Sequence, residues 1–199
     1  MDTDTPLLAR AYNLGLKAVP NFVILTKKQI EYYEGNLDEL KNAISRGFII
    51  PKPDFNFSIN VDRSVNAKFP VWVEEIINPE LQNSGPENYD LSSLELWLHD
   101  DQKNGVVGGN TIYESFKVNN LLEGCLNLQD GLAIRAKGIM VFRELFQGKA
   151  VYLWKSVVQN RDGDLYVPYL YVSGDEVWLI WSSLDYNWNS NYPALRFSK

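Results

Sequence analysis

The fold class of this chain is decided by the stretch Val157-Val-Gln-Asn-Arg-Asp-Gly-Asp-Leu-Tyr-Val-Pro-Tyr-Leu-Tyr171. Apolar, β-branched and aromatic residues flank the run Asn160–Asp164, which contains an Asp-Gly pair typical of hairpin turns. A second turn at Ser173–Asp175 is followed by another apolar run. The pattern predicts a three-strand antiparallel meander over residues 150–181. Pro168 has no N–H to donate to a strand ladder, so we expect it at a bulge or at an outward-facing position.

The acidic turn resembles the start of an EF-hand calcium loop, which is the alternative interpretation. Such a loop has oxygen ligands at positions 1, 3, 5 and 12 and a glycine at position 6. With Asn160 at position 1, Asp162 and Asp164 fall at 3 and 5, but Leu165 and Tyr171 fall at 6 and 12. Because the glycine and the bidentate glutamate are missing, the pattern favours a simple hairpin turn.

Two further segments upstream of the meander alternate in polarity, as half-buried strands do. Phe55–Val61 carries apolar residues at every second position, and Leu94–His99 carries leucine at every second position. This period of two predicts a strand in each segment. In the second segment the strand would extend to His99.

Helices are predicted between these strands and the meander. Thr111–Lys117 is expected to form one short helix with Asn110 as its cap. Leu121–Phe146 is apolar and should be helical in parts, with interruptions at Gly131 and Gly138. Residues 54–199 therefore read as one α+β domain that ends in an antiparallel meander.

Residues 1–53 are predicted to form a separate small α/β unit. Phe22–Leu25 is a short apolar strand, and Asn36–Glu39 resembles a capping box before a helix. Ala18–Gly35 and the helix after it resemble the C-terminal part of a thioredoxin fold without its Cys-x-x-Cys pair, so no redox chemistry is implied. A local strand–turn–helix unit without that kinship is the alternative. Two prolines within Ile49–Pro53 mark the domain boundary.

Composition restricts the class of function. The chain has 199 residues, 45% hydrophobic and 22% charged, and a formal net charge of -6, which is typical of a globular protein. The negative net charge argues against binding to phosphate backbones and to anionic membranes, because both attract clustered Lys and Arg. No run approaches the ~20 apolar residues of a membrane-spanning helix, and the acidic start MDTDTPLLAR is unlike a signal peptide. We therefore expect a soluble cytoplasmic protein with no nucleic-acid and no membrane partner.

The single cysteine and single histidine limit the chemistry further. Cys125 cannot form an internal disulfide and lies in the apolar run Leu121–Leu128, so we expect a small core residue without a redox or metal role. One His and one Cys supply too few ligands for a structural zinc site. Gly105–Thr111 matches neither nucleotide-binding glycine pattern. Accordingly, no cofactor and no metal ion is expected.

Aromatic residues are concentrated in the C-terminal quarter of the chain. We expect Trp154, Trp178 and Trp181 to be core residues of the β-structure. For Tyr186 and for Trp188 and Tyr192, which stand among Asn and Ser, two interpretations remain open. They could belong to the same core, or to a surface that binds a sugar or a protein, since Tyr and Trp combine apolar area with a polar group.

Several pieces between residues 57 and 197 match a known pattern: Ser58-Ile-Asn-Val-Asp-Arg-Ser64, Leu96-Trp-Leu-His-Asp-Asp-Gln-Lys103, Val167-Pro-Tyr-Leu-Tyr171 and Pro193-Ala-Leu-Arg-Phe197. In these pieces the chain resembles a family of uncharacterised bacterial proteins. The resemblance leaves out the N-terminal 50 residues. No activity is assigned to that family, so the resemblance implies no specific reaction or ligand.

Polar residues of mixed chemistry are concentrated where the second predicted strand meets a glycine-rich loop, a place where sites are often found. A solvated turn at the end of a strand is the simpler interpretation of this segment. The candidate binding residues are Asp62, Arg63, Trp97, His99, Asp100, Gln102 and Lys103.

Two classes of function fit these residues. The first is a non-catalytic binding or protein-interaction module with an unknown protein or small-molecule partner. The alternative is a hydrolytic enzyme, with or without a metal ion, in which the only histidine acts as a general base. The two differ in whether the groups meet in one pocket. The hydrolytic site would be centred on Asp62, Arg63, His99, Asp100 and Lys103.

Overall fold

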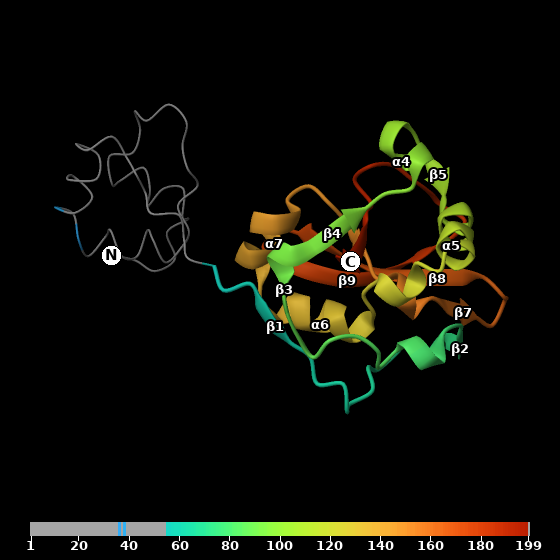
Figure 1. Ribbon diagram of the computed structural model, residues 1–199, viewed down its shortest axis with the longest axis horizontal. Coiled ribbons are helices and arrows are strands. Elements are labelled where there is room, and N and C mark those ends of the chain that lie inside the picture. Colours follow the sequence, from blue (N-terminus) through green and yellow to red (C-terminus); the bar gives the residue numbers. More distant parts are fainter. Residues whose placement is uncertain (1–35, 37, 39–54, 199) are drawn as a thin grey trace. The chain divides into compact units, whose positions relative to one another are not determined.

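The computed structural model describes residues 36, 38 and 55–198. The chain divides into two compact units, Met1–Asp54 and Phe55–Lys199. Apart from Asn36 and Asp38, the strand and helix expected before residue 54 lie outside the described residues. The second unit has an α+β fold (Figure 1).

The second unit is built on one seven-stranded sheet. Its strands follow the order β2-β7-β8-β6-β11-β4, and β9 pairs with the other edge of β8. All of these pairs are antiparallel except that of β6 with β11, which is parallel. The seven strands are β2 (Val73–Ile76), β4 (Leu94–Trp97), β6 (Val151–Tyr152), β7 (Val158–Asn160), β8 (Leu165–Ser173), β9 (Glu176–Ser183) and β11 (Ala194–Phe197).

Two small antiparallel sheets are added to the main one. In the first, β1 pairs with β3, and in the second, β5 pairs with β10. The first lies next to the start of the described unit, and the second joins the segment after β9 to the segment before Gly109. These strands are β1 (Ser58–Asn60), β3 (Asn88–Asp90), β5 (Val107–Gly108) and β10 (Asn187–Trp188).

The predicted meander is confirmed in β7, β8 and β9. The Asp-Gly run forms the turn between β7 and β8, where Gly163 has a φ of 92°. The side-chain oxygen of Asn160 accepts hydrogen bonds from the amides of Asp162 and Asp164 at 3.0 and 2.8 Å. Asn160 therefore closes the turn with its own side chain, in the manner of an Asx-turn. A two-residue turn at Gly174 and Asp175 joins β8 to β9.

Both predictions for Pro168 are wrong. Pro168 is buried within β8 and pairs in regular register with Trp181 of β9, without a bulge. On the other side of β8 its carbonyl accepts from the Leu153 N–H at 3.0 Å. The N and O of a residue in an antiparallel ladder point to the same neighbour. The missing N–H therefore falls where the neighbouring strand is interrupted, at the 3-10 turn Trp154–Ser156 between β6 and β7.

Four α-helices complete the described unit: α4 (Asp100–Asn104), α5 (Gly109–Val118), α6 (Leu128–Ala136) and α7 (Ile139–Phe146). Helix α5 starts earlier than predicted, because Gly108 is its N-cap and Asn110 lies in the first turn. The side-chain NH2 of Asn110 instead donates to the carboxylate of Asp185 at 2.9 Å. None of the helices in the described part of the chain has the length and apolarity needed to cross a membrane.

Of the two glycines expected to interrupt the helical region, only Gly138 does so. Gly138 has a φ of 86° and separates α6 from α7. Gly131 lies inside α6, where a Cβ would come within 2.3 Å of the Leu153 side chain. At Gly131 the absence of a side chain permits close helix–sheet packing and does not end the helix.

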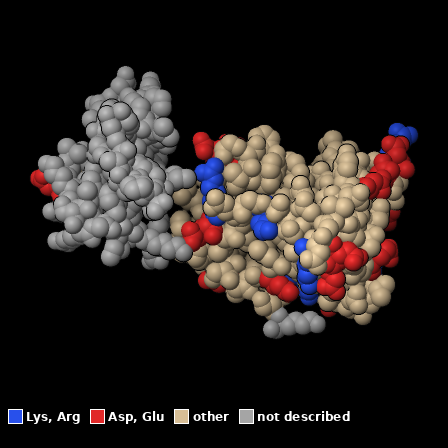
Figure 2. All heavy atoms as spheres, turned by 90° about the horizontal axis from the view of Figure 1, so that it is seen from above, with Lys and Arg blue, Asp and Glu red and all other residues tan. Residues whose placement is uncertain are grey.

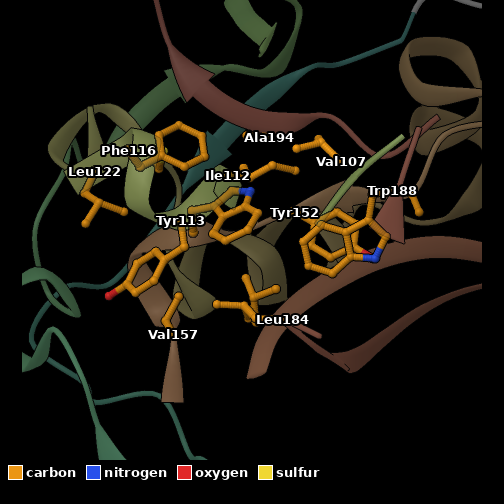
Figure 3. Close-up of a cluster of buried hydrophobic side chains, with 14 residues drawn as sticks. Val107, Ile112, Tyr113, Phe116, Leu122, Tyr152, Val157, Leu184, Trp188 and Ala194 are labelled. Atoms are coloured by element: carbon orange, nitrogen blue, oxygen red, sulfur yellow. The ribbon is translucent and has the colours of Figure 1, made fainter. Parts of the chain in front are cut away.

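The core has one hydrophobic cluster on each face of the sheet. One cluster is aromatic and lies beside α5, where Phe116, Tyr152, Trp154 and Trp188 are in contact (Figure 3). The other is mainly aliphatic and lies under α6 and α7. Side chains alternate along a strand, so Val167 belongs to the first cluster whereas Leu170 belongs to the second.

The expectation for the tryptophans is only partly confirmed. Trp154 is fully buried, but Trp178 is 47% exposed and Trp181 is half-buried. Of the aromatic residues left open, Trp188 is buried in the first cluster, and Tyr186 is 65% exposed. The sheet thus displays some of its aromatic residues to solvent.

We predict that Cys125 reacts very slowly with thiol reagents in the folded protein. Its side chain is buried, as expected, and its Sγ lies 3.6 Å from the carbonyl of Leu121. Burial raises the pKa of the thiol to about 12, although Arg196 and Lys155 nearby act in the opposite direction. Modification by Ellman's reagent at pH 8 should be at least about a hundredfold slower than in denaturant. Equal rates in the two conditions would contradict the prediction.

Candidate functional site

His99 is the N-cap of helix α4, and this role fixes its position. Strand β4 ends at Trp97, earlier than the predicted end at His99, and the helix begins at Asp100. The Asp101 amide donates to the ring Nδ1 of His99 at 3.3 Å, and the His99 amide donates to the Gln102 side chain at 3.3 Å. These reciprocal bonds form a capping box, in which a histidine occupies the usual place of Ser, Thr or Asp.

The capping bond selects the tautomer of the imidazole. Because Nδ1 accepts a hydrogen bond, the proton of the neutral ring lies on Nε2. The Asp101 carboxylate also lies 3.6 Å from Nδ1, but its side chain is 75% exposed and can turn into solvent. The backbone amide of Asp101, which the helix holds in place, therefore sets the tautomer, and the exposed Asp101 carboxylate does not. The second nitrogen of His99 is then a hydrogen-bond donor.

A cavity of about 400 Å³ lies beside β4, α4 and α5. Trp97 forms one wall and packs on Phe116 of α5 with ring centroids 4.4 Å apart. The His99 ring stands edge-on to Trp97 at 6.4 Å. Four of the seven candidate residues are among those that line the cavity: Glu95, Leu96, Trp97, Leu98, His99, Asp100, Lys103, Ser115 and Asn119.

The charged groups of this cavity are mostly exposed. Lys103 and Asp100 form a salt bridge of 2.8 Å, which lowers the pKa of Asp100 through the Lys103 hydrogen bond and charge. The Glu95 carboxylate lies 3.7 Å from the guanidinium of the buried Arg196. Lys103 is thus the exposed ammonium among the residues that line the cavity, and it lies on a short helix whose first turn is acidic.

Five of the lining residues were not among the candidates, and three of these are polar: Glu95, Ser115 and Asn119. Glu95 stands two positions before Trp97, so the alternation of a strand could have placed both on one face. Ser115 and Asn119 are four residues apart at the end of α5, and the side-chain NH2 of Asn119 donates to the Ser115 carbonyl at 2.8 Å. Their spacing indicates a shared helix face, but no local signal shows that this face meets β4.

Gln102 has a structural position next to the cavity. Its side chain is buried and donates to the carbonyls of Asn189 and Tyr192 at 2.9 and 2.8 Å. This residue fastens α4 to the segment between β10 and β11. It is not among the residues that line the cavity.

The structure places Asp62 and Arg63 outside the cavity. Arg63 reaches the N-terminus of α6, where its guanidinium contacts the carboxylate of Asp130 at 2.6 Å and the side chain of Asn127 at 3.2 Å. The carboxylate of Asp62 accepts from the hydroxyl and the amide of Ser64, which lowers its pKa. The five residues proposed for a hydrolytic centre are therefore divided between two places.

Arg63 belongs to a buried network of charges. Asp130 is fully buried and also accepts from the Tyr89 hydroxyl at 3.1 Å; burial, and next the Asp130 charge, raise the pKa of Tyr89. Lys155 is 1% exposed, and burial lowers the pKa of its ammonium, with Asp130 the largest opposing influence. Asp130 lies in α6, whereas Arg63 follows β1 and Tyr89 lies in β3. The network therefore joins α6 to the small sheet formed by β1 and β3.

Neither metal ligation nor a broad basic surface distinguishes the described unit. Among residues 36, 38 and 55–198, no three His, Cys, Asp or Glu side chains come close enough together to hold a metal ion. On the face shown in Figure 2, acidic and basic atoms are interspersed and no continuous basic patch is seen. No family model, curated protein or solved structure matches this chain.

Proposed function

We propose that the protein is a non-catalytic binding module, and that a small polar ligand occupies the cavity beside β4, α4 and α5. One observation carries the proposal: Trp97, His99, Asp100 and Lys103 line a single cavity of about 400 Å³. That volume lies within the range of roughly 300–1,000 Å³ that ligand pockets occupy.

The geometry favours binding over hydrolysis. A general base needs an unshared electron pair directed at the substrate, and the pair on Nδ1 of His99 is occupied by the helix cap. The two carboxylates of the cavity face cations, since Asp100 contacts Lys103 and Glu95 lies near Arg196. Each carboxylate thus has a cation as its neighbour, and the two do not form a pair for acid–base catalysis.

The lining also indicates the chemistry of the ligand. His99 offers Nε2–H and Lys103 offers an ammonium, so the ligand would carry hydrogen-bond acceptors such as a carboxylate or hydroxyl groups. The ring of Trp97 gives an apolar wall against which a carbon skeleton can pack. A cytoplasmic location, the absence of nucleic-acid partners and the relationship to uncharacterised bacterial proteins stay predictions.

The only histidine of the chain allows a direct test, because its ring nitrogens are unambiguous in an NMR spectrum. We expect the neutral ring to show the Nε2–H tautomer, and addition of succinate or glycerol to shift Nε2 more than Nδ1. His99→Asn retains a good helix cap and removes the imidazole with its Nε2–H, and Lys103→Met removes the cation. Both variants should lose binding of the probe that binds the parent, read from the indole N–H signal of Trp97, which lines the cavity and is present in every variant.

Lys137→Met provides a matched control at the end of α6, outside the cavity. It should bind the probe as the parent does, and all three variants should unfold at the same temperature as the parent. An Nδ1–H tautomer, or Nε2 resonances that neither succinate nor glycerol moves, would contradict the proposal.

A further inference from the structure

Strand β9 is an open edge of the main sheet. Within the described unit, three strands of this sheet have a single neighbour: β2, β4 and β9. Strand β9 pairs only with β8, in regular register from Glu176 to Ser183. The outer side of β9 therefore has no strand beside it in the part of the chain that the structure describes.

Backbone groups on this outer side lack hydrogen-bond partners. The N–H of Leu184, directly after β9, donates to the Leu165 carbonyl of β8 at 2.9 Å. Because successive residues of a strand direct their N–H and C=O groups to alternate sides, Val177, Leu179 and Trp181 direct theirs away from β8. Among the described residues, no backbone group of another strand or loop pairs with these outward N–H and C=O groups.

The other two edges of the sheet are protected, whereas β9 is not. Natural proteins protect an edge by making it short, by a bulge or by charged side chains. Strand β2 has four residues, two of them glutamates, and its register shifts between Val73 and Glu75. Strand β4 also has four residues and carries Glu95. Strand β9 has eight residues, a regular register and no charge from Val177 to Ser183. A long, regular and uncharged edge is typical of a strand that pairs with a further strand.

A second copy of β9 fits this edge with a register that satisfies the backbone. Two identical strands can pair antiparallel about a two-fold axis, which then passes beside one residue. With the axis at Leu179, the two copies of Leu179 exchange hydrogen bonds, and Val177 of each copy exchanges them with Trp181 of the other. The outward groups of these three residues are then all paired. Ser183, the next outward residue, stays outside this ladder, and its carbonyl already accepts from the Tyr186 N–H at 3.4 Å.

The side chains agree with the same register. Trp178 is 47% exposed in the single chain, and the two-fold axis places it opposite Ile180 of the second copy. Cross-strand pairs of an aromatic and a β-branched side chain stabilise a sheet. Glu176, the only charged residue of β9, falls opposite Ser182, so no like charges meet across the interface.

We propose that two copies of this chain form a symmetric dimer in which their β9 strands pair antiparallel about Leu179. The two main sheets become one continuous sheet. Pairing along a single strand buries less than the roughly 1,200 Å² of a standard interface, so the dimer is reversible and dissociates in the micromolar range. The interface shares no residue with the lining of the cavity, and the two proposals can fail independently.

Sedimentation of the full-length protein tests the dimer directly. Over about a hundredfold range of concentration through the micromolar region, the average mass should rise from that of one chain toward that of two. The rise should stop at two, because the two-fold axis uses the open edge of both copies.

A charge on the edge should prevent the pairing. Trp178→Lys places an ammonium opposite Ile180 of the second copy, and we expect it to weaken dimerisation at least about tenfold. Its side chain is half exposed in the single chain, so the urea midpoint of the monomer should change little. Val118→Lys is the matched control, because Val118 is a 77% exposed residue at the end of α5. It should form the dimer as the parent does.

Disulfide formation between two different variants tests the register. Opposite residues of a pair without mutual hydrogen bonds lie about 4.5 Å apart between Cα atoms, within reach of a disulfide. A mixture of Trp178→Cys and Ile180→Cys should therefore form a disulfide-linked dimer on mild oxidation. Either variant alone should not, because its two cysteines lie diagonally, about 7–8 Å apart. The native Cys125 is buried and takes no part.

Three results would overturn the inference, and the first needs no variant. One is a parent protein that stays monomeric over the whole concentration range, or that grows beyond a dimer. Another is equal dimerisation of Trp178→Lys and Val118→Lys. The third is a disulfide that forms as readily in Trp178→Cys alone or in Ile180→Cys alone as in their mixture.

Discussion

Asp130→Asn should lower the free energy of unfolding by about 3–5 kcal/mol, the usual result of removing one partner from a buried ion pair. Asp130 has no solvent exposure, and Arg63 beside it is nearly as buried. Its two carboxylate oxygens accept from Arg63 and Tyr89 on one side and from the Asn127 amide on the other. The carboxylate thus closes a capping box and neutralises a guanidinium at once.

An asparagine cannot replace this carboxylate, although it has nearly the same shape. One of its two terminal atoms is an NH2 group, so in either orientation a donor faces a donor. The charge of Arg63 would also be left in the interior without its main partner. An unsatisfied buried donor and an uncompensated charge both destabilise the folded state, which explains the expected magnitude.

Urea unfolding followed by tryptophan fluorescence measures the effect, because all six tryptophans lie between residues 72 and 188, in the second unit. Asp100→Asn is the control: it breaks an ion pair with Lys103 at the surface and should leave the urea midpoint unchanged. The double variant Arg63→Met, Asp130→Leu should be more stable than Asp130→Asn, since it leaves no guanidinium without its carboxylate partner in the interior. A loss below about 1 kcal/mol in Asp130→Asn would contradict this account of the network.

The sequence predicted those elements whose signals are local. The β7–β8–β9 meander follows from alternation and from turn residues that fix two hairpins. The end of β4 was placed two residues too late, because Leu98 and His99 continue the alternation of the strand. The capping box of His99 and Gln102 overrides that alternation, and histidine is an uncommon residue at an N-cap. The position of Pro168 inside β8 depends on the interruption between β6 and β7 in the neighbouring strand. No local sequence pattern predicts that interruption.

The same distinction applies to the candidate site. Trp97, His99, Asp100 and Lys103 came together in the prediction because they are neighbours in the chain. Asp62 and Arg63 were grouped with them on residue type alone, and the structure gives Arg63 a partner in α6 instead. Ser115 was missed because its place in the cavity depends on how α5 packs against β4. The periodicity of a sequence predicts which residues share one face of a helix or strand, but it does not predict which other helix or strand packs on that face.

Gly109→Ala should destabilise the protein by about 2–3 kcal/mol, opposite in sign to the usual effect of this change in a helix. Gly109 is the first residue of α5 and is buried, with its amide bonded to the Tyr186 carbonyl. A Cβ there would lie 2.6 Å from two ring atoms of Trp188 and 2.7 Å from the Leu184 carbonyl oxygen. Trp188 cannot easily move, because it packs on Tyr152 with ring centroids 4.6 Å apart.

The contact with Trp188 can be separated from other causes by a double-mutant cycle. The atoms of Trp188 nearest to Gly109 belong to the six-membered ring of the indole. Trp188→Phe gives a shorter side chain at that place and leaves a cavity, which is itself destabilising. Gly109→Ala should therefore cost less in the Trp188→Phe background than in the parent. Gly105→Ala is the control, since a Cβ there meets only the Asp101 carbonyl at 3.4 Å. If Gly105→Ala and Gly109→Ala lowered the urea midpoint equally, close packing at Trp188 would not be the reason for glycine at position 109.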